Sequence, residues 1–376
     1  MITKKYKQFY PLSAIAFILA LGAVPHAFAA SYYWDTTTTG LWTTGSNWST
    51  SSTGSPAGTV APSSSITADS AVFNGSSVNG NETIQLSAAT SIAGITFNNT
   101  GTTTIASTTV AEQKITIGAG GITMAATAGN VTFDITNKAA VTIGANQTWT
   151  NNNSAATLGG FSGIVLNANT LTLAGAGNFS FNPSMTATSA GVLNANQTGT
   201  LTLGGGSVSF VGTLNTGLNG GTVLLANSVV LTGVGALVGI QGGTIAASSS
   251  SARTLVANTS VSNDFTLGQA ATGTGVVTIS GAMDLNNATR QITTANSADT
   301  LSGVISNGGL TKAGIGTLTL SGTGANTYTG LTTVGAGGLT LSKTSVNAIA
   351  GNVVVNGTGT LTLGCLLYTS PSPRDS

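Results

Sequence analysis

The sequence predicts an all-β protein built as a β-solenoid, a rod of stacked backbone coils. Charged residues make up only 5% of the 376 residues, and 52 residues are glycine. Strand-forming Val, Ile, Leu and Thr alternate with turn-forming Gly, Asn and Ser along most of the chain. This composition fits neither a charged disordered chain nor an ordinary helical domain. It indicates many short strands joined by tight turns.

A short unit of aliphatic, threonine and aliphatic residues, followed closely by glycine, recurs along the chain. Alternate side chains of a strand face opposite sides, so each unit buries two aliphatic side chains and exposes one threonine. One coil holds too few apolar residues to bury its own strands, whereas stacked coils share a continuous core. A β-sandwich or propeller is the structural alternative, although its outward positions usually carry charges. The units begin at Ile115, Val141, Leu171, Leu201, Val277, Leu318, Leu339 and Leu361.

The spacing of these units predicts the length of a coil. The starts at 318, 339 and 361 follow one another at nearly equal intervals, and those at 141, 171 and 201 follow at equal but longer ones. We expect each interval to be one coil of roughly 22 to 30 residues, which predicts roughly 11 to 15 coils between positions 30 and 364.

The N-terminal segment 1–29 predicts a secretory signal peptide. Lys4, Lys5 and Lys7 precede an apolar run at Leu12–Val24, and Ala27 and Ala29 flank a cleavage site. The apolar run is shorter than the roughly 20 residues that a membrane-spanning helix needs. Cleavage after Ala29 would also remove the only histidine of the chain, which is His26.

Residues 30–65 predict an aromatic N-terminal cap and a loop, followed by solenoid repeats over 66–364. Trp34, Trp42 and Trp48, three of the four tryptophans, crowd into the cap. A terminal coil must cover the open end of the core, and large flat rings suit that role. A site at which these rings stack on a sugar is the alternative interpretation.

Residues 365–376 differ abruptly in composition from everything before them. From Cys365 onward the Gly/Thr/Leu pattern ends, and codons for this segment match a transposase-type sequencing adapter read in frame. We expect an artefact and a natural gene that continues past Gly364; a genuine Ser/Pro-rich tail is the alternative. Under the artefact interpretation the only cysteine is spurious, and disulfide and thiol arguments lapse.

The charge inventory excludes several function classes. Between positions 30 and 364 eight acidic side chains stand against six basic ones, with no histidine. Nucleic-acid binding needs basic patches, catalytic triads need a base, and zinc sites need nitrogen or sulfur ligands. We therefore expect no nucleic-acid partner, no metal and no cofactor.

Polysaccharide-active enzymes on β-helices form the enzymatic alternative. They need grouped carboxylates, and Asp264 and Asp284, about one coil apart near Arg290, are the candidates. We interpret them as scattered turn acids. Outward threonines also suggest ice binding as an alternative function, but no regular threonine array over many coils is evident in the sequence.

Residues 308–334 closely resemble the autotransporter-associated β-strand repeat. They join a Lys-Ala-Gly-Ile-Gly-Thr-Leu core to an Asn-Thr-Tyr-Thr-Gly turn, and weaker copies lie at 94–99 and 141–151. Leu331 departs from the pattern, because a smaller residue is common there. The matching residues are Gly309, Leu310, Lys312, Gly314, Gly316, Thr317, Leu318, Leu320, Gly322, Asn326, Thr327, Tyr328, Thr329 and Gly330.

The resemblance implies a right-handed parallel β-helix that export machinery delivers to the surface of a Gram-negative-type bacterium. It also implies an outer-membrane barrel or a sorting anchor beyond the visible repeats. Family members use the repeat as a stalk or scaffold, so no catalytic residue is transferred. We therefore expect a secreted structural stalk that contributes to adhesion or aggregation through surface glycans or self-association, by many weak contacts. A carbohydrate-binding adhesin module is the alternative.

Overall fold

The structure is a computed structural model. It describes residues 30–36, 39–53, 58, 60–73, 80–108, 113–135, 141–181, 185–186, 191–204, 212–217, 220–230, 236–270, 273–296 and 298–364. The predicted signal peptide at 1–29 and the predicted artefact at 365–376 lie outside the described residues.

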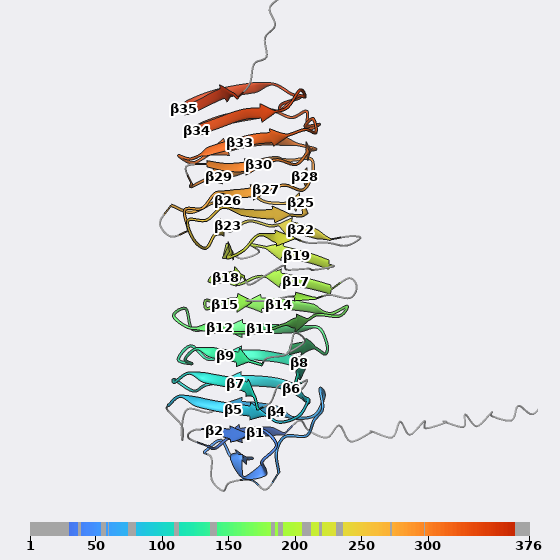
Figure 1. Ribbon diagram of the computed structural model, residues 1–376, viewed down its shortest axis with the longest axis vertical. Coiled ribbons are helices and arrows are strands. Elements are labelled where there is room, and N and C mark those ends of the chain that lie inside the picture. The colour runs from blue at the N-terminus through green and yellow to red at the C-terminus, as the bar shows by residue number, and fades with distance from the viewer. Residues whose placement is uncertain are drawn as a thin grey trace, which may run out of the picture.

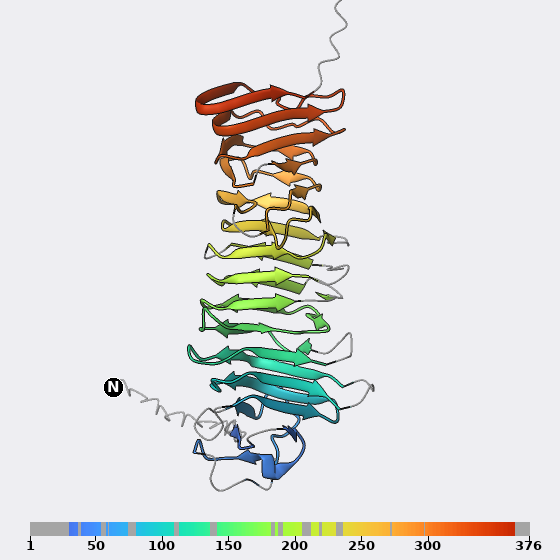
Figure 2. The same cartoon turned by 60° about the vertical axis from the view of Figure 1, so that its left-hand side comes forward.

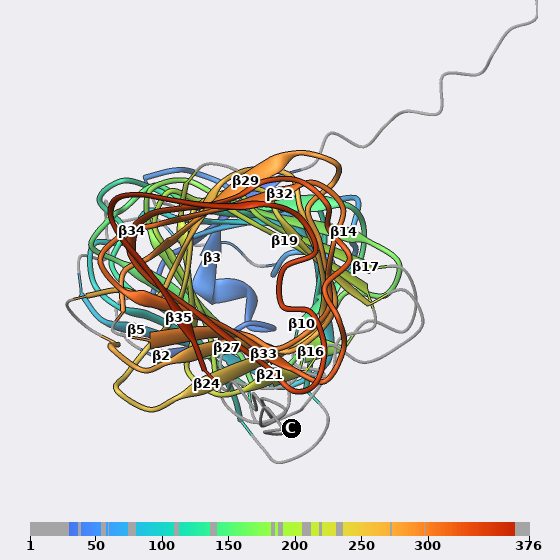
Figure 3. The same ribbon diagram turned by 90° about the horizontal axis from the view of Figure 1, so that it is seen from above.

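The chain forms a parallel β-solenoid of about 11 turns, drawn as a rod in Figures 1 and 2. The predicted all-β parallel β-helix with an aromatic-rich N-terminal end is thereby confirmed. Its cross-section has three sides, as the view along the axis shows (Figure 3). The only antiparallel pairing among the described strands joins β1 to β3 near the N-terminal end. In the part of the chain that the structure describes, no helix is long and apolar enough to cross a membrane.

Each turn visits three sides of the rod, which we number faces one, two and three. The strands of face one are β1 (Ser31–Trp34), β3 (Trp48–Ser49), β4 (Ser70–Phe73), β6 (Thr90–Phe97), β8 (Ile115–Met124), β11 (Gln147–Asn151), β14 (Thr170–Ala174), β17 (Gly191–Ala195), β19 (Gly212–Thr216), β22 (Leu237–Ile240), β25 (Asn258–Val261), β28 (Met283–Asp284) and β31 (Ile305–Ser306). The short 3-10 segment η1 (Gly45–Asn47) directly precedes β3, a strand of face one. The long strands β6 and β8 begin on face three and continue into face one.

Face two follows face one in every turn. It contains β2 (Thr39–Leu41), β5 (Glu82–Leu86), β7 (Thr103–Ser107), β9 (Val131–Asp134), β12 (Thr157–Gly159), β15 (Asn178–Phe181), β18 (Thr200–Leu203), β20 (Thr222–Leu225), β23 (Thr244–Ala247), β26 (Phe265–Leu267), β29 (Thr289–Thr294) and β32 (Gly309–Ala313).

Face three closes each turn. It contains β10 (Val141–Ile143), β13 (Ile164–Val165), β16 (Met185–Thr186), β21 (Val229–Val230), β24 (Arg253–Val256), β27 (Val277–Ile279), β30 (Ala298–Leu301) and β33 (Thr317–Gly322). The long strands β34 (Thr332–Lys343) and β35 (Val353–Leu363) run from face two into face three.

The recurring unit behaves as predicted within a strand. In the unit that starts at Leu171, both leucines are fully buried and the threonine between them is half-buried. The same alternation holds for the unit at Leu318. Buried aliphatic rows therefore run along the inside of the rod, and threonines cover the outside.

The predicted coil length is right in one part of the chain and wrong in another. Leu318 pairs with Leu339, and Leu339 pairs with Leu361, so these shorter intervals are single turns. The units at 141, 171 and 201 instead lie on three different faces, in β10, β14 and β18. The longer interval is thus one turn plus one face, because every face uses the same unit.

Candidate functional site

The residues of the repeat motif hold successive turns together. Lys312 is fully buried, and its Nζ donates to the carbonyl oxygens of Ala313, Gly314 and Ala336 at 2.8, 2.9 and 3.0 Å. Ala336 belongs to the next turn, so the ammonium joins two turns. Gly314 adopts φ +79°, a conformation that favours glycine. The lysine and the glycine of the motif therefore have a structural role at this corner.

The Asn-Thr-Tyr-Thr-Gly segment also connects successive turns, through the side chain of Asn326. The Asn326 side chain accepts from the Ile305 amide at 2.8 Å and donates to the Ala348 carbonyl at 2.7 Å, which connects three turns. Tyr328 is fully buried, with its hydroxyl 2.9 Å from that of Thr332. The other members divide between the interior and the turns: Leu310, Leu318 and Leu320 are fully buried, Gly309 and Gly316 are buried, Thr317, Gly322 and Gly330 are half-buried, and Thr327 and Thr329 are exposed.

A buried polar cluster lies beside Lys312. Asp299 is fully buried, and its Oδ1 accepts from the Val277 amide at 2.9 Å. Burial raises the pKa of Asp299, and the backbone hydrogen bond and nearby Lys312 only partly oppose this. Burial also lowers the pKa of Lys312 to about 8. The Oδ2 atom of Asp299 and the Oγ1 atom of Thr294 have no hydrogen-bond partner among the described residues. This cluster is enclosed by the core and cannot meet a substrate without the rod opening.

The three predicted cap tryptophans pack into the core at the N-terminal end. Trp34, Trp42 and Trp48 are at most 2% exposed. The ring of Trp48 meets those of Trp34 and Trp42 edge-on, at centroid distances of 4.9 and 5.0 Å. Phe73 of the next strand on face one lies 5.9 Å from Trp48. None of these three tryptophan rings offers an open face on which a sugar could stack.

The acidic residues proposed for an enzymatic site are not brought together. Asp264 precedes β26 on face two and accepts from the Gln291 amide at 2.7 Å. Asp284 lies in β28 on face one and accepts from the Asn286 amide and the Asn307 side chain at 2.8 and 3.0 Å. The two carboxylates lie on different faces, so the alternative in which they stack on successive coils is not realised. Spacing alone could not show this, because one turn visits three faces.

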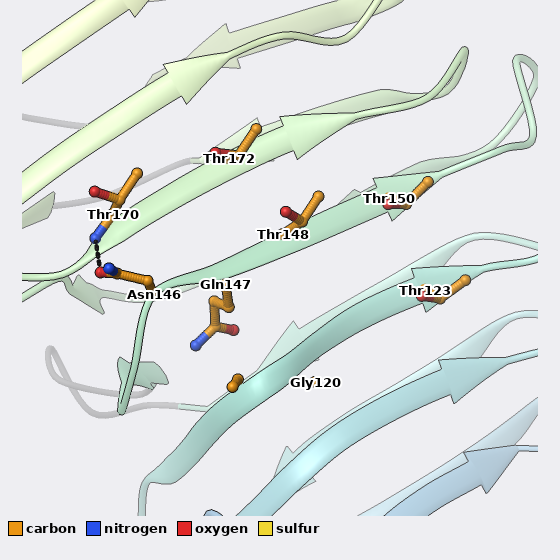
Figure 4. Close-up of a pocket in the computed structure, with 9 residues that line it drawn as sticks. Gly120, Thr123, Asn146, Gln147, Thr148, Thr150, Thr170 and Thr172 are labelled. Atoms are coloured by element: carbon orange, nitrogen blue, oxygen red, sulfur yellow. Dashed lines mark hydrogen bonds between the residues drawn. The ribbon is translucent and has the colours of Figure 1, made fainter.

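A shallow groove lies on face one (Figure 4). Its volume is about 530 Å³. Gly120 and Gln147 form its floor, and the Gln147 amide donates to the Ile117 carbonyl at 2.8 Å. None of the described residues that line it carries a carboxylate, an ammonium group or an aromatic ring. The lining residues are Ala119, Gly120, Thr123, Asn146, Gln147, Thr148, Thr150, Thr170 and Thr172. Such a surface can offer neutral hydrogen bonds but no acid–base chemistry.

A second shallow groove lies on face two, with a volume of about 360 Å³. Thr244, Thr266 and Thr293 line it, and these three residues pair in register on successive turns. Asp264 adds a carboxylate to this lining. Among the described residues, no three His, Cys, Asp or Glu side chains gather closely enough to hold a metal ion.

One buried acid was not anticipated from the sequence. Glu82 begins β5, is 3% exposed, and accepts from the Thr103 hydroxyl at 2.8 Å. Burial raises its pKa to about 7, although hydrogen bonds from Thr103 and Asn99 oppose the shift. A signal was present, because Glu82 has the same inward parity as Ile84 and Leu86 in the strand.

Comparisons with known proteins add no information to the assignments made from the geometry. No protein-family model matches the chain. No curated protein and no solved structure matches it either. The fold and the sites described above therefore define the molecule as a parallel β-solenoid with internal structural polar groups and shallow surface grooves.

Proposed function

We propose that this chain is a structural stalk, exported and displayed at a bacterial surface as an autotransporter-like passenger. The observation that carries the proposal is the use of the motif residues: Lys312, Asn326 and Tyr328 are buried, and the side chains of Lys312 and Asn326 connect turns. A rod whose polar side chains are spent on stacking can be lengthened one turn at a time without building a pocket. Its function is to hold a distal region away from the cell.

Adhesion or aggregation is a second part of this proposal. The two grooves are shallow; threonine dominates the lining of the first, and the second combines threonine with glycine, Asp264 and Phe265, so a single contact to a surface glycan or a second copy is weak. Many such contacts along one rod add by avidity. Catalysis is not part of the proposed function, because Asp264 and Asp284 are separate and each is engaged in a turn.

The stalk can be tested by removing whole turns. Val238, Thr259, Met283 and Ile305 occupy equivalent positions on successive turns. Deleting residues 238–304 therefore joins Leu237 to Ile305 in register and removes three turns, which should shorten the rod by roughly 14 Å. With the chain anchored on cells and an epitope placed before Ala30, we expect antibody access to fall in the deletion, and small-angle scattering of the purified protein to show a shorter rod.

The competing functions have distinct outcomes in the same material. The complete chain is also assayed against glycan arrays and for cleavage of pectin and mucin-type glycans. Unchanged epitope access in a correctly shortened rod, together with saturable binding of one glycan, would replace the stalk with an adhesin module. Glycan cleavage that is lost in Asp264→Asn would replace it with an enzyme.

A further inference from the structure

Face three carries a regular grid of hydroxyl groups. Thr278, Thr300, Thr319 and Thr340 pair in register on four successive turns. Each is followed two residues later by a serine; Ser321 and Ser342 pair in register, whereas Ser280 and Ser302 directly follow the ends of β27 and β30. The serines are Ser280, Ser302, Ser321 and Ser342, and Thr254 and Thr362 extend the threonine file by one turn at each end. We call the eight central residues the hydroxyl array.

The array corrects the expectation that no regular threonine array exists. Its signal is a Thr-aliphatic-Ser unit that recurs in β27, β30, β33 and β34. In the sequence this unit is hidden among similar threonine units that belong to the other two faces. Only the strand register separates the four that stack.

The threonine hydroxyls of the array are open toward the outside, whereas the Ser280 hydroxyl donates to the Leu255 carbonyl oxygen at 3.5 Å. The hydroxyls of Thr278, Thr300, Thr319 and Thr340 form no hydrogen bond to any other described residue, and all four side chains are half-buried. Beneath them, Leu301 and neighbouring aliphatic side chains are at most 1% exposed and fix the sheet.

Face one behaves differently, although it also bears stacked polar residues. The Asn215 side chain donates to that of Asn194 at 2.8 Å, and Asn286 donates to the Ser260 hydroxyl at 2.8 Å. These polar groups satisfy one another along the rod. Face two also stacks threonines in register, at Thr222, Thr244, Thr266 and Thr293, but no serine follows any of them two residues later. The combination of a threonine file with a serine beside each threonine is therefore what distinguishes face three.

The geometry of the array restricts its partner. Neighbouring strands lie about 4.7–4.9 Å apart, and residues two apart on a strand are separated by roughly 6.5 Å, so the hydroxyls form a flat rectangular grid. None of the eight positions is ionisable, and Lys343 at the end of β34 is held by the carbonyl oxygens of Gly303 and Ser321 at 3.0 and 2.9 Å. A flexible ligand gains no affinity from hydroxyls that stand in register over four turns, whereas a crystalline lattice with a matching repeat does.

We propose that the hydroxyl array of face three binds ice. Ice is a lattice of uncharged hydrogen-bonding groups, and water oxygens within it repeat at distances similar to those of the grid. Threonine offers a hydroxyl that joins this lattice and a methyl group around which water is already ordered. The inference stands apart from the proposed stalk function, because a stalk needs no free hydroxyls in register.

The test measures how much of the complete purified protein enters a slowly growing ice hemisphere. The informative variant is Thr300→Tyr with Thr319→Tyr, since tyrosine suits strands and its ring would project above the grid. The matched control is Thr213→Tyr on face one, where the register neighbours are Val192 and Leu237. Circular dichroism verifies that each variant keeps its β structure.

We expect the unmodified chain and the control to enter the ice and the double variant to be excluded. Exclusion of the unmodified chain, or equal entry of the double variant, would overturn the proposal. Powdered chitin and cellulose serve as alternative lattices in a pull-down with the same three proteins. Binding to either powder that the double variant loses, without entry into ice, would also overturn it and assign the array to a crystalline glycan.

Discussion

The N-terminal and C-terminal parts of the rod fill the same kind of turn in different ways. Up to Phe181 the interior contains aromatic rings in contact, such as Phe133 and Phe161 at 4.8 Å. From Leu237 onward the core is mainly aliphatic, and buried polar side chains such as Lys312 join the turns. The difference teaches that a solenoid can exchange ring packing for polar connections without changing its topology.

The two parts of the rod also differ in turn length. In the N-terminal part Ile95 pairs with Ile122, and Ile122 pairs with Trp149, so each of these pairings spans one turn. Both turns contain more residues than the turn that leads from Leu318 to Leu339. The turn from Leu171 to Leu193 is nevertheless about as short as the C-terminal ones and still buries Phe179 and Phe181, so turn length does not decide which side chains fill the core.

The largest expected effect breaks the aromatic packing. Trp149 is fully buried, lies 5.2 Å from the ring of Phe161, and donates from Nε1 to the Gln147 side chain at 2.7 Å. Trp149→Ala should lower the free energy of unfolding by about 4 kcal/mol, because it leaves a cavity and an unpaired buried amide oxygen. Urea unfolding followed by circular dichroism measures it, and exposed Thr148→Ala is the control. A loss below that of the control would show that ring packing does not stabilise this region.

Part of the fold could be predicted from the sequence, and part of it could not. The inward position of Leu171 and the grouping of Trp34 with its neighbours followed from alternation and from clustering. The strand register did not, because three faces share one unit, and an interval such as Val141 to Leu171 looks like a single coil. Glu82 was recognisable only by parity, and the Lys312 hydrogen bonds depend on two turns whose stacking no local pattern specifies.

The next largest effect breaks a polar connection in the C-terminal part. Lys312→Met keeps the apolar stem but removes the donor to Ala313, Gly314 and Ala336, and it leaves Asp299 buried without a nearby cation. We expect a loss of about 3 kcal/mol. The control is Lys114→Met, because Lys114 is exposed.

Thermal unfolding of the two lysine variants, followed by circular dichroism, compares them directly. The double variant Lys312→Met with Asp299→Asn should recover part of the stability, since it removes the uncompensated charge. Equal stability of Lys312→Met and the unmodified protein would mean that the C-terminal turns rely on aliphatic packing alone, as the N-terminal turns rely on rings.

The smallest expected effect is a pH dependence that arises in the N-terminal part. The pKa of Glu82 is raised to about 7 in the folded protein, above its ordinary value of 4.5. Its contribution to stability is therefore complete below about pH 4.5 and is lost as the pH rises through 7, because the unfolded chain releases the proton first. Between pH 5 and pH 8 this predicts a loss of roughly 2 kcal/mol.

Glu82→Gln isolates that contribution, because the amide keeps the size and a hydrogen-bond acceptor for Thr103 but does not titrate. Urea unfolding at pH 5 and pH 8 should show a smaller pH dependence in the variant; burial raises the pKa of Asp299 as well, and this acts in the same direction. Lys312, with a pKa of about 8, stays mostly charged through most of this window and contributes little. If the free energy of unfolding of Glu82→Gln depends on pH as steeply as that of the unmodified protein, the pH-sensitive group lies in the C-terminal cluster and not at Glu82 in the N-terminal part.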